Sequence, residues 1–144
     1  MGGRGARYFK KGDSGIKGKA STQSTIGSIR RMVAEELKGK IFKKSIVVGN
    51  QQKNISFEIQ SRGLSHIAND IHSHKVIKPS KIKFLSEYLQ RSSFTGHSPK
   101  NHPRKDACRN FYYFTDKKTG ITFNVGEKIT NEKVSYSLYA ITRK

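Results

Sequence analysis

The chain has 144 residues, 33% of them hydrophobic, and it carries 29 Lys and Arg against 10 Asp and Glu, for a formal net charge of +19. This length suits one domain with a tail and excludes two separate cores. A surplus of this size destabilises a compact state by self-repulsion unless a polyanion binds, so nucleic acid is the expected partner. A membrane is not expected to be one, because no segment approaches the roughly 20 consecutive apolar residues of a span.

Residues 1–24 are rich in glycine and basic residues and show no apolar period. Such a composition predicts a flexible basic arm. The segment also lacks the apolar stretch of a secretory signal, and Cys108 is the single cysteine, so no intrachain disulfide can form. We therefore expect the chain to act in the cytoplasm, with one folded domain over residues 25–144.

The domain is predicted to begin with a helix over residues 25–38, where apolar residues recur at three- and four-residue spacing before Gly39. Two short strands follow, at 45–48 and 55–60. The Gly49-Asn50 pair between them predicts an antiparallel hairpin. In the second strand apolar residues occupy every second position, which is typical of a half-buried strand.

From Ser61 the apolar spacing becomes helical, and this predicted helix carries the leading candidates for chemistry. His66 and Asp70 lie four residues apart, so the carboxylate can bond the imidazole, orient it and raise its pKa. A perturbed titratable group is only a pointer to a site. Two interpretations therefore stay open: His66 is catalytic, or it is a solvated residue on the edge of a helix.

A third helix is predicted from Pro79, followed by a long polar loop over 91–106. In that loop Lys100, Arg104 and Lys105 would place positive charge beside the sheet. Long loops without structure are uncommon in compact domains unless they are functional or disordered.

The last third of the chain predicts a meander of three strands, at 107–115, 121–125 and 134–140, with Gly120 in the first turn. The full order is then αββααβββ. This order predicts an α+β domain in which a mostly antiparallel sheet of about four to five strands packs on helices.

Several chemistries are excluded by residue type and spacing. His72 and His74 lie two residues apart on a helix and point to different sides, and one cysteine cannot complete a structural zinc site. The acids are scattered, without the carboxylate cluster that two-metal phosphodiester cleavage needs. We therefore expect neither a metal nor another cofactor.

Metal-independent RNA cleavage remains, since it needs a base, an acid and cations around the phosphate, which His, Tyr, Lys and Arg can supply. Exposed tyrosines could also stack on unpaired bases, although core packing is the alternative for each of them. The residues predicted to bind nucleic acid are Arg62, Lys75, Lys100, Arg104, Lys105, Tyr112 and Tyr113.

Four runs carry a family resemblance: residues 55–57 (ISF), 63–67 (GLSHI), 111–113 (FYY) and 134–139 (VSYSLY). Over roughly residues 25–142 the chain resembles the phage and polymorphic-toxin branch of the barnase, EndoU, colicin and RelE (BECR) nuclease superfamily. The resemblance implies a small α+β domain with ribonuclease activity. It also implies action in a bacterial or phage-infected cell, carriage in a virion, and an immunity or virion protein as partner.

The resemblance further implies roles for individual residues. His66 stands at the family's helix histidine, and Arg109 with Ser137 or Tyr139 stands near the sheet positions used for phosphate and acid-base roles. Because no second histidine occurs in the last three strands, a pair of sheet histidines is not available.

The resulting hypothesis is a metal-independent endoribonuclease that acts on RNA rather than DNA. Its catalytic residues are His66, Asp70, Arg109, Ser137 and Tyr139. The alternative is a non-catalytic nucleic-acid-binding or virion-associated phage protein that uses the same basic surface. A factor that binds a host protein is the third interpretation.

Overall fold

The computed structural model describes residues 25–99 and 109–143, so the predicted basic arm and the loop cations Lys100, Arg104 and Lys105 lie outside the described residues. The elements are, in order, α1 (Ile26–Leu37), β1 (Phe42–Val48), β2 (Gln51–Ile59), α2 (Ser61–His72), a 3-10 helix η3 (Pro79–Phe84), α3 (Leu85–Arg91), β3 (Ser93–Pro99), β4 (Asn110–Asp116), β5 (Ile121–Thr130) and β6 (Lys133–Arg143).

The strands form one six-stranded sheet in the order β1-β2-β6-β5-β4-β3, antiparallel throughout except that β2 and β6 are parallel. The predicted α+β class and mostly antiparallel sheet are confirmed. The predicted four to five strands and the order αββααβββ were wrong, because β3 occupies part of the predicted loop. Its sequence, SFTGHSP, lacks apolar alternation, and it lies at the sheet edge where β4 alone pairs with it.

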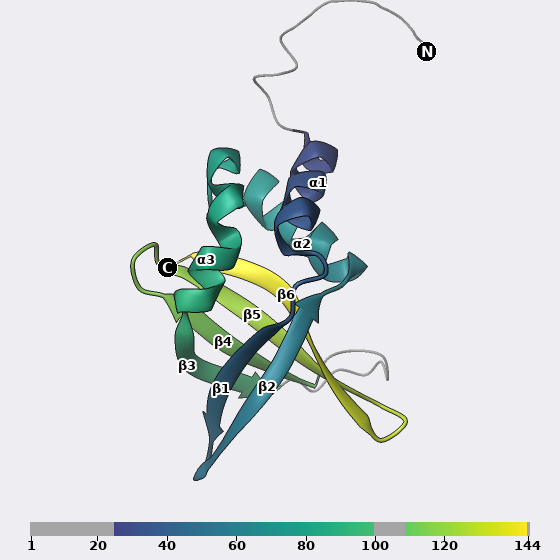
Figure 1. The fold of residues 1–144 in the computed structure, drawn as a ribbon, viewed down its shortest axis with the longest axis vertical. Helices are drawn as coiled ribbons and strands as arrows, with labels where there is room; N and C mark the ends of the chain where they lie inside the picture. The colour runs from purple at the N-terminus through teal and green to yellow at the C-terminus, as the bar shows by residue number, and fades with distance from the viewer. Residues whose placement is uncertain (1–24, 100–108, 144) are drawn as a thin grey trace, which may run out of the picture.

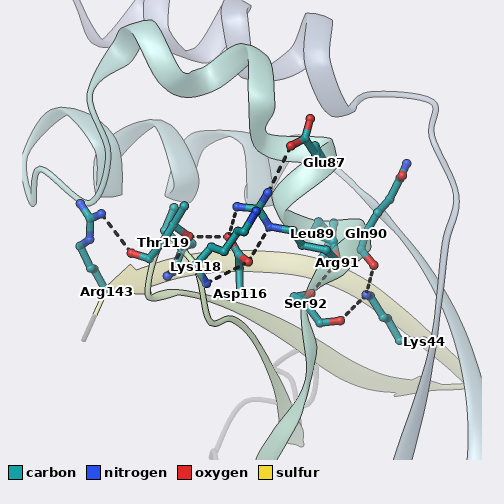
Figure 2. Close-up of polar contacts among 11 residues, drawn as sticks. Lys44, Glu87, Leu89, Gln90, Arg91, Ser92, Asp116, Lys118, Thr119 and Arg143 are labelled. Carbon is teal, nitrogen blue, oxygen red and sulfur yellow. Dashed lines mark hydrogen bonds and ion pairs between the residues drawn. The ribbon is translucent and has the colours of Figure 1, made fainter.

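The sheet curls until its two edge strands, β1 and β3, come into contact, which gives it the shape of an incomplete barrel (Figure 1). Lys44 of β1 joins the two edges, since its Nζ donates to the carbonyl oxygens of Gln90 and Ser92 at the junction of α3 and β3 (Figure 2). Burial lowers the pKa of this lysine. The contact covers backbone groups that an open sheet edge would leave unpaired.

The helices gather at one end of the curved sheet, and the β1–β2 hairpin and β5–β6 hairpin point away from them (Figure 1). Each helix buries its apolar stripe on the inner face of the sheet, as its sequence predicts. Thr25 begins α1, and its hydroxyl accepts the Ser28 N–H at 3.1 Å. The inner face of the sheet therefore holds the core, and the opposite face of β4, β5 and β6 is left without a helix.

An ion pair between an exposed arginine and a buried carboxylate fixes α3 to the turn between β4 and β5 (Figure 2). Arg91 donates to both carboxylate oxygens of Asp116, at 2.7 and 2.9 Å, and the Thr119 hydroxyl donates to the same carboxylate at 2.6 Å. These hydrogen bonds, the one from Arg91 above all, lower the pKa of Asp116 to about 2. Gly120 completes the turn with φ +79°, in agreement with the predicted need for glycine there.

Candidate functional site on the outer face of the sheet

The outer face of the sheet is the face of β4, β5 and β6 that points away from the core. Along β4, Tyr112 and Phe114 are buried in the core, whereas Phe111 and Tyr113 alternate with them and are only half-buried. Tyr113 pairs with Asn124 of β5, so both side chains lie on this outer face. The outer face is therefore where polar and aromatic side chains remain accessible.

Helix α2 replaces β2 as the neighbour of β6. The parallel pairing of β2 with β6 ends at Ile59 and Leu138, and beyond that point the edge of β6 faces α2. The Asp70 carboxylate accepts the Ile141 N–H at 3.0 Å, and a Cβ at Gly63 would collide with the Leu138 carbonyl oxygen. We name this contact the α2–β6 seam.

A β-bulge in β6 places a tyrosine on the α2–β6 seam. Val125 pairs with Leu138 and Asn124 pairs with Ala140, so Tyr139 is an extra residue without a partner on β5. Bulges commonly re-aim a side chain. The Tyr139 ring lies 4.4 Å from the His66 ring, centroid to centroid, and 5.3 Å from the Phe111 ring.

Two predicted catalytic residues, His66 and Tyr139, are therefore brought together by elements that are distant in the sequence. His66 is exposed on the flank of α2, and its imidazole lies at 35° to the Tyr139 ring. A ring contact of this kind restrains the imidazole without using its nitrogens as hydrogen-bond partners.

Asp70 does not play the predicted part of a hydrogen-bond partner to His66. Its carboxylate bonds the Ile141 N–H instead, since β6 has lost its strand partner at that point. Burial raises the pKa of Asp70, and the Ile141 hydrogen bond and the charges of His74 and His66 oppose that rise. Asp70 is thus a positioning residue that stabilises the seam and lies within electrostatic reach of two imidazoles.

His74 is a site residue that the sequence interpretation missed. His66 lies on α2, which ends at His72, and His74 lies in the turn that follows the helix. Both imidazoles are close enough to the Asp70 carboxylate to lower its pKa through their charges. The four-residue spacing of His66, Asp70 and His74 is a signal present in the sequence. A second imidazole, which the last three strands lack, therefore comes from the turn after α2.

Beyond His74 the α2–β6 seam opens into a hollow of about 580 Å³, and two of the side chains that line this hollow are cationic. The lining residues are Asp70, His74, Lys75, Val76, Ile141, Thr142 and Arg143. Arg143 donates to the carbonyl oxygens of Val76 and Thr119, at 3.1 and 3.0 Å, and is held in place by them. Lys75, which was predicted to bind nucleic acid, has φ +54°, a strained conformation that tends to occur at functional sites.

The remaining predicted residues are less closely assembled. Arg62 is exposed in the first turn of α2, and Ser137 is half-buried opposite Gly126, two residues before Tyr139. Arg109 is exposed at the start of β4, and its backbone N–H donates to the Glu127 carbonyl oxygen. Within residues 25–99 and 109–143, no hydrogen bond or ion pair joins Arg109 to His66 or Tyr139.

Tyr112 is a correction to the predicted nucleic-acid-binding set. It is only 4% exposed, and its hydroxyl donates to the Glu127 carboxylate at 3.3 Å. Burial, followed by the negative charge of Glu127, raises its pKa to about 12. This tyrosine belongs to a polar cluster on the inner face, so the alternative of core packing holds for it, and its ring cannot stack on a base.

Three acids are engaged by other groups of the fold. Asp116 is bound to Arg91, Glu36 accepts both the backbone N–H and the hydroxyl of Ser86, and Glu127 is 7% exposed. Four other acids of the described residues are exposed, namely Glu35, Glu58, Glu87 and Glu132, and so are most of the Lys and Arg side chains. The described surface therefore carries more basic than acidic side chains, which favours a polyanionic ligand.

Comparison of the chain with protein-family models, curated proteins and solved structures found no match. Among the described residues no three His, Cys, Asp or Glu side chains are grouped so that they could hold a metal ion. In the same part of the chain, no helix has the length and apolar character that crossing a membrane would require.

Proposed function

We propose that this protein is a metal-independent endoribonuclease whose active site is the α2–β6 seam. The observation that carries the proposal is the contact of His66 with Tyr139 at 4.4 Å, with His74 in the turn after α2 on the other side of Asp70 in the sequence. The resemblance to the BECR nucleases implies the same role for His66. The exposed positive charge and the hollow beside Lys75 and Arg143 support a polyanionic substrate.

The chemistry follows from two imidazoles, His66 on α2 and His74 in the turn after it. One imidazole takes the proton of the ribose 2′-hydroxyl while the 2′-oxygen bonds to phosphorus, and the other gives a proton to the 5′-oxygen as the P–O5′ bond breaks. The products are a 2′,3′-cyclic phosphate and a 5′-hydroxyl. Lys75 and Arg143 stabilise the charge that develops on the phosphate oxygens, and Asp70 holds α2 against β6.

RNA is favoured over DNA because this reaction needs the 2′-hydroxyl. Half-buried aromatic rings on the outer face, Phe111 and Tyr113, offer surfaces for unpaired bases. Arg62 lies on the same helix as His66 and supplies a further phosphate contact. Phosphate contacts of this kind make binding fall steeply as the salt concentration rises.

The test is cleavage of labelled tRNA and mRNA in EDTA by the full chain and by His66→Ala, His74→Ala and His72→Ala. His72 is the control on the same helix. It does not line the hollow next to His74 but an adjacent one, which shares Lys75 and Arg143 with it. We expect losses of roughly 10²- to 10⁴-fold for His66→Ala and His74→Ala and little change for His72→Ala, as for a general acid or base.

A non-catalytic nucleic-acid-binding protein, free or virion-associated, is the second candidate. The observation that favours it is that the described residues provide His66 with a ring contact but with no hydrogen-bonded orienting partner. If the parent and His66→Ala both bind RNA in a salt-dependent manner and neither cuts it, the ribonuclease proposal is wrong and the non-catalytic candidate takes its place.

A further inference from the structure

A second hollow, of about 420 Å³, lies on the outer face next to the seam. It is lined by Thr95, Tyr113, Thr122, Asn124 and Thr142, which come from the four neighbouring strands β3 to β6. Thr142 lines this hollow and the hollow beside Lys75 and Arg143 as well. The two hollows are therefore neighbours, one cationic and one uncharged.

The lining of the second hollow is polar but has no charged side chain. Its threonines are fixed through a chain of hydroxyl contacts, from Thr95 to Thr115 at 3.0 Å and from Thr115 to Thr122 at 2.9 Å. Tyr113 adds an aromatic ring. Hydroxyls, an amide and a ring face suit an uncharged heterocycle, and the absence of cations from this lining makes it unsuited to a phosphate.

The amide of Asn124 is the feature that points to a ligand. Its Oδ1 atom is buried and has no hydrogen-bond partner, although the side chain lines the hollow. A buried acceptor without a donor costs free energy, which a ligand with an N–H group can recover. The terminal torsion of asparagine is soft, so the amide can turn its oxygen and nitrogen together toward a bound molecule.

We propose that this hollow is a nucleobase site that prefers adenine. An asparagine amide matches adenine in a bidentate manner, accepting from the N6 amino group and donating to N7. Tyr113 pairs with Asn124 across β4 and β5, so its ring stands beside that amide to stack on the base. Binding of the base does not require ribonuclease activity. The proposal rests on the proposed function only where it puts the bound adenosine next to the phosphodiester bond that is cut.

The first measurement uses AMP, GMP, CMP and UMP with the full chain, by NMR titration of the asparagine side-chain amides. AMP is expected to bind most tightly and to shift the Asn124 amide resonances. Asn124→Asp should reduce AMP affinity roughly tenfold and remove the preference, because a carboxylate cannot donate to N7. Asn131→Asp is the matched control, since Asn131 is exposed in the turn between β5 and β6.

Substitution of Tyr113 separates stacking from hydrogen bonding. Tyr113→Phe should retain AMP binding and Tyr113→Ala should lose it, with thermal unfolding used to confirm that both variants fold. Equal affinity for the four nucleotides, or AMP shifts that avoid Asn124, would overturn the base site even if the protein cuts RNA. AMP bound at Asn124 by a protein that never cuts RNA would overturn the ribonuclease and leave the base site standing.

Discussion

The molecule contains two clusters that each combine a histidine, a tyrosine, a lysine and a carboxylate, one on each face of the sheet. The outer cluster consists of His66, Tyr139, Asp70 and Lys75, and the inner cluster consists of His97, Tyr112, Glu127 and Lys53. In the inner cluster the polar groups satisfy one another, since Glu127 accepts from the hydroxyls of Tyr112 and Tyr136 and from the amide of Asn110. In the outer cluster the Asp70 carboxylate accepts a backbone N–H and no side-chain donor of the described residues, whereas exposed histidine and lysine side chains occur in both clusters, His66 and Lys75 in one and His97 and Lys53 in the other.

The difference shows that residue type alone does not decide which carboxylate is saturated with hydrogen bonds from side chains. His97 stacks on Tyr112 with ring centroids 5.4 Å apart, and Lys53 lies over the Tyr136 ring at 5.8 Å. Hydrogen bonding of the Lys53 ammonium to the Tyr136 oxygen is the main cause that raises the pKa of Lys53. A network closed in this way stabilises the fold, whereas groups that are positioned but not saturated are available to a substrate.

The largest expected effect on stability comes from opening the inner cluster. Glu127→Ala would leave two tyrosine hydroxyls and the Asn110 amide without their acceptor, which should lower the free energy of unfolding by about 2–4 kcal/mol. Urea denaturation measures this loss, and Glu132→Ala, in the exposed β5–β6 turn, is the control. RNA cleavage per folded molecule should be unchanged; a specific loss of cleavage would move the active site to the inner face.

A smaller effect on stability is expected from loss of the ion pair between Arg91 and Asp116. The pKa of Asp116 is lowered to about 2 in the folded state, so its stabilisation is complete above its usual pKa of about 4 and is lost as the pH falls through 2. The contribution is on the order of 2 kcal/mol. Thermal unfolding of Asp116→Asn between pH 5 and pH 2 should show a shallower acid destabilisation than the parent, and parallel curves would contradict it.

The smallest effect is expected at Lys75, where the outer cluster carries strain. Lys75→Gly should raise the free energy of unfolding by about 1 kcal/mol, because glycine adopts φ +54° without a steric cost. The same change should weaken RNA binding and reduce the salt dependence of binding by about one phosphate contact. Lys75→Ala removes the charge but keeps a side chain at the same positive φ, so it should not raise the free energy of unfolding. Equal stabilisation by both variants would show that relief of backbone strain at Lys75 is not the cause.

The sequence predicted most elements because their patterns are local. The change from two-residue to helical spacing at Ser61 placed the β2–α2 junction, and Gly120 placed a turn. Strand β3 was missed, since a polar edge strand is specified by pairing with β4. His66 could be identified from its helix, whereas the bulge at Tyr139 and the orphan amide of Asn124 arise from contacts between distant strands, which no local pattern encodes.

The backbone contact at Gly63 has a consequence for how the outer cluster forms. No side chain separates α2 from the Leu138 carbonyl, so main-chain atoms set the spacing between the imidazole and the bulged tyrosine. Main-chain spacing does not depend on which rotamer a side chain adopts. The ring contact between His66 and Tyr139 is therefore formed when the domain folds and needs no incoming molecule to complete it, so a ligand that binds there would not have to lose the entropy of arranging the two rings.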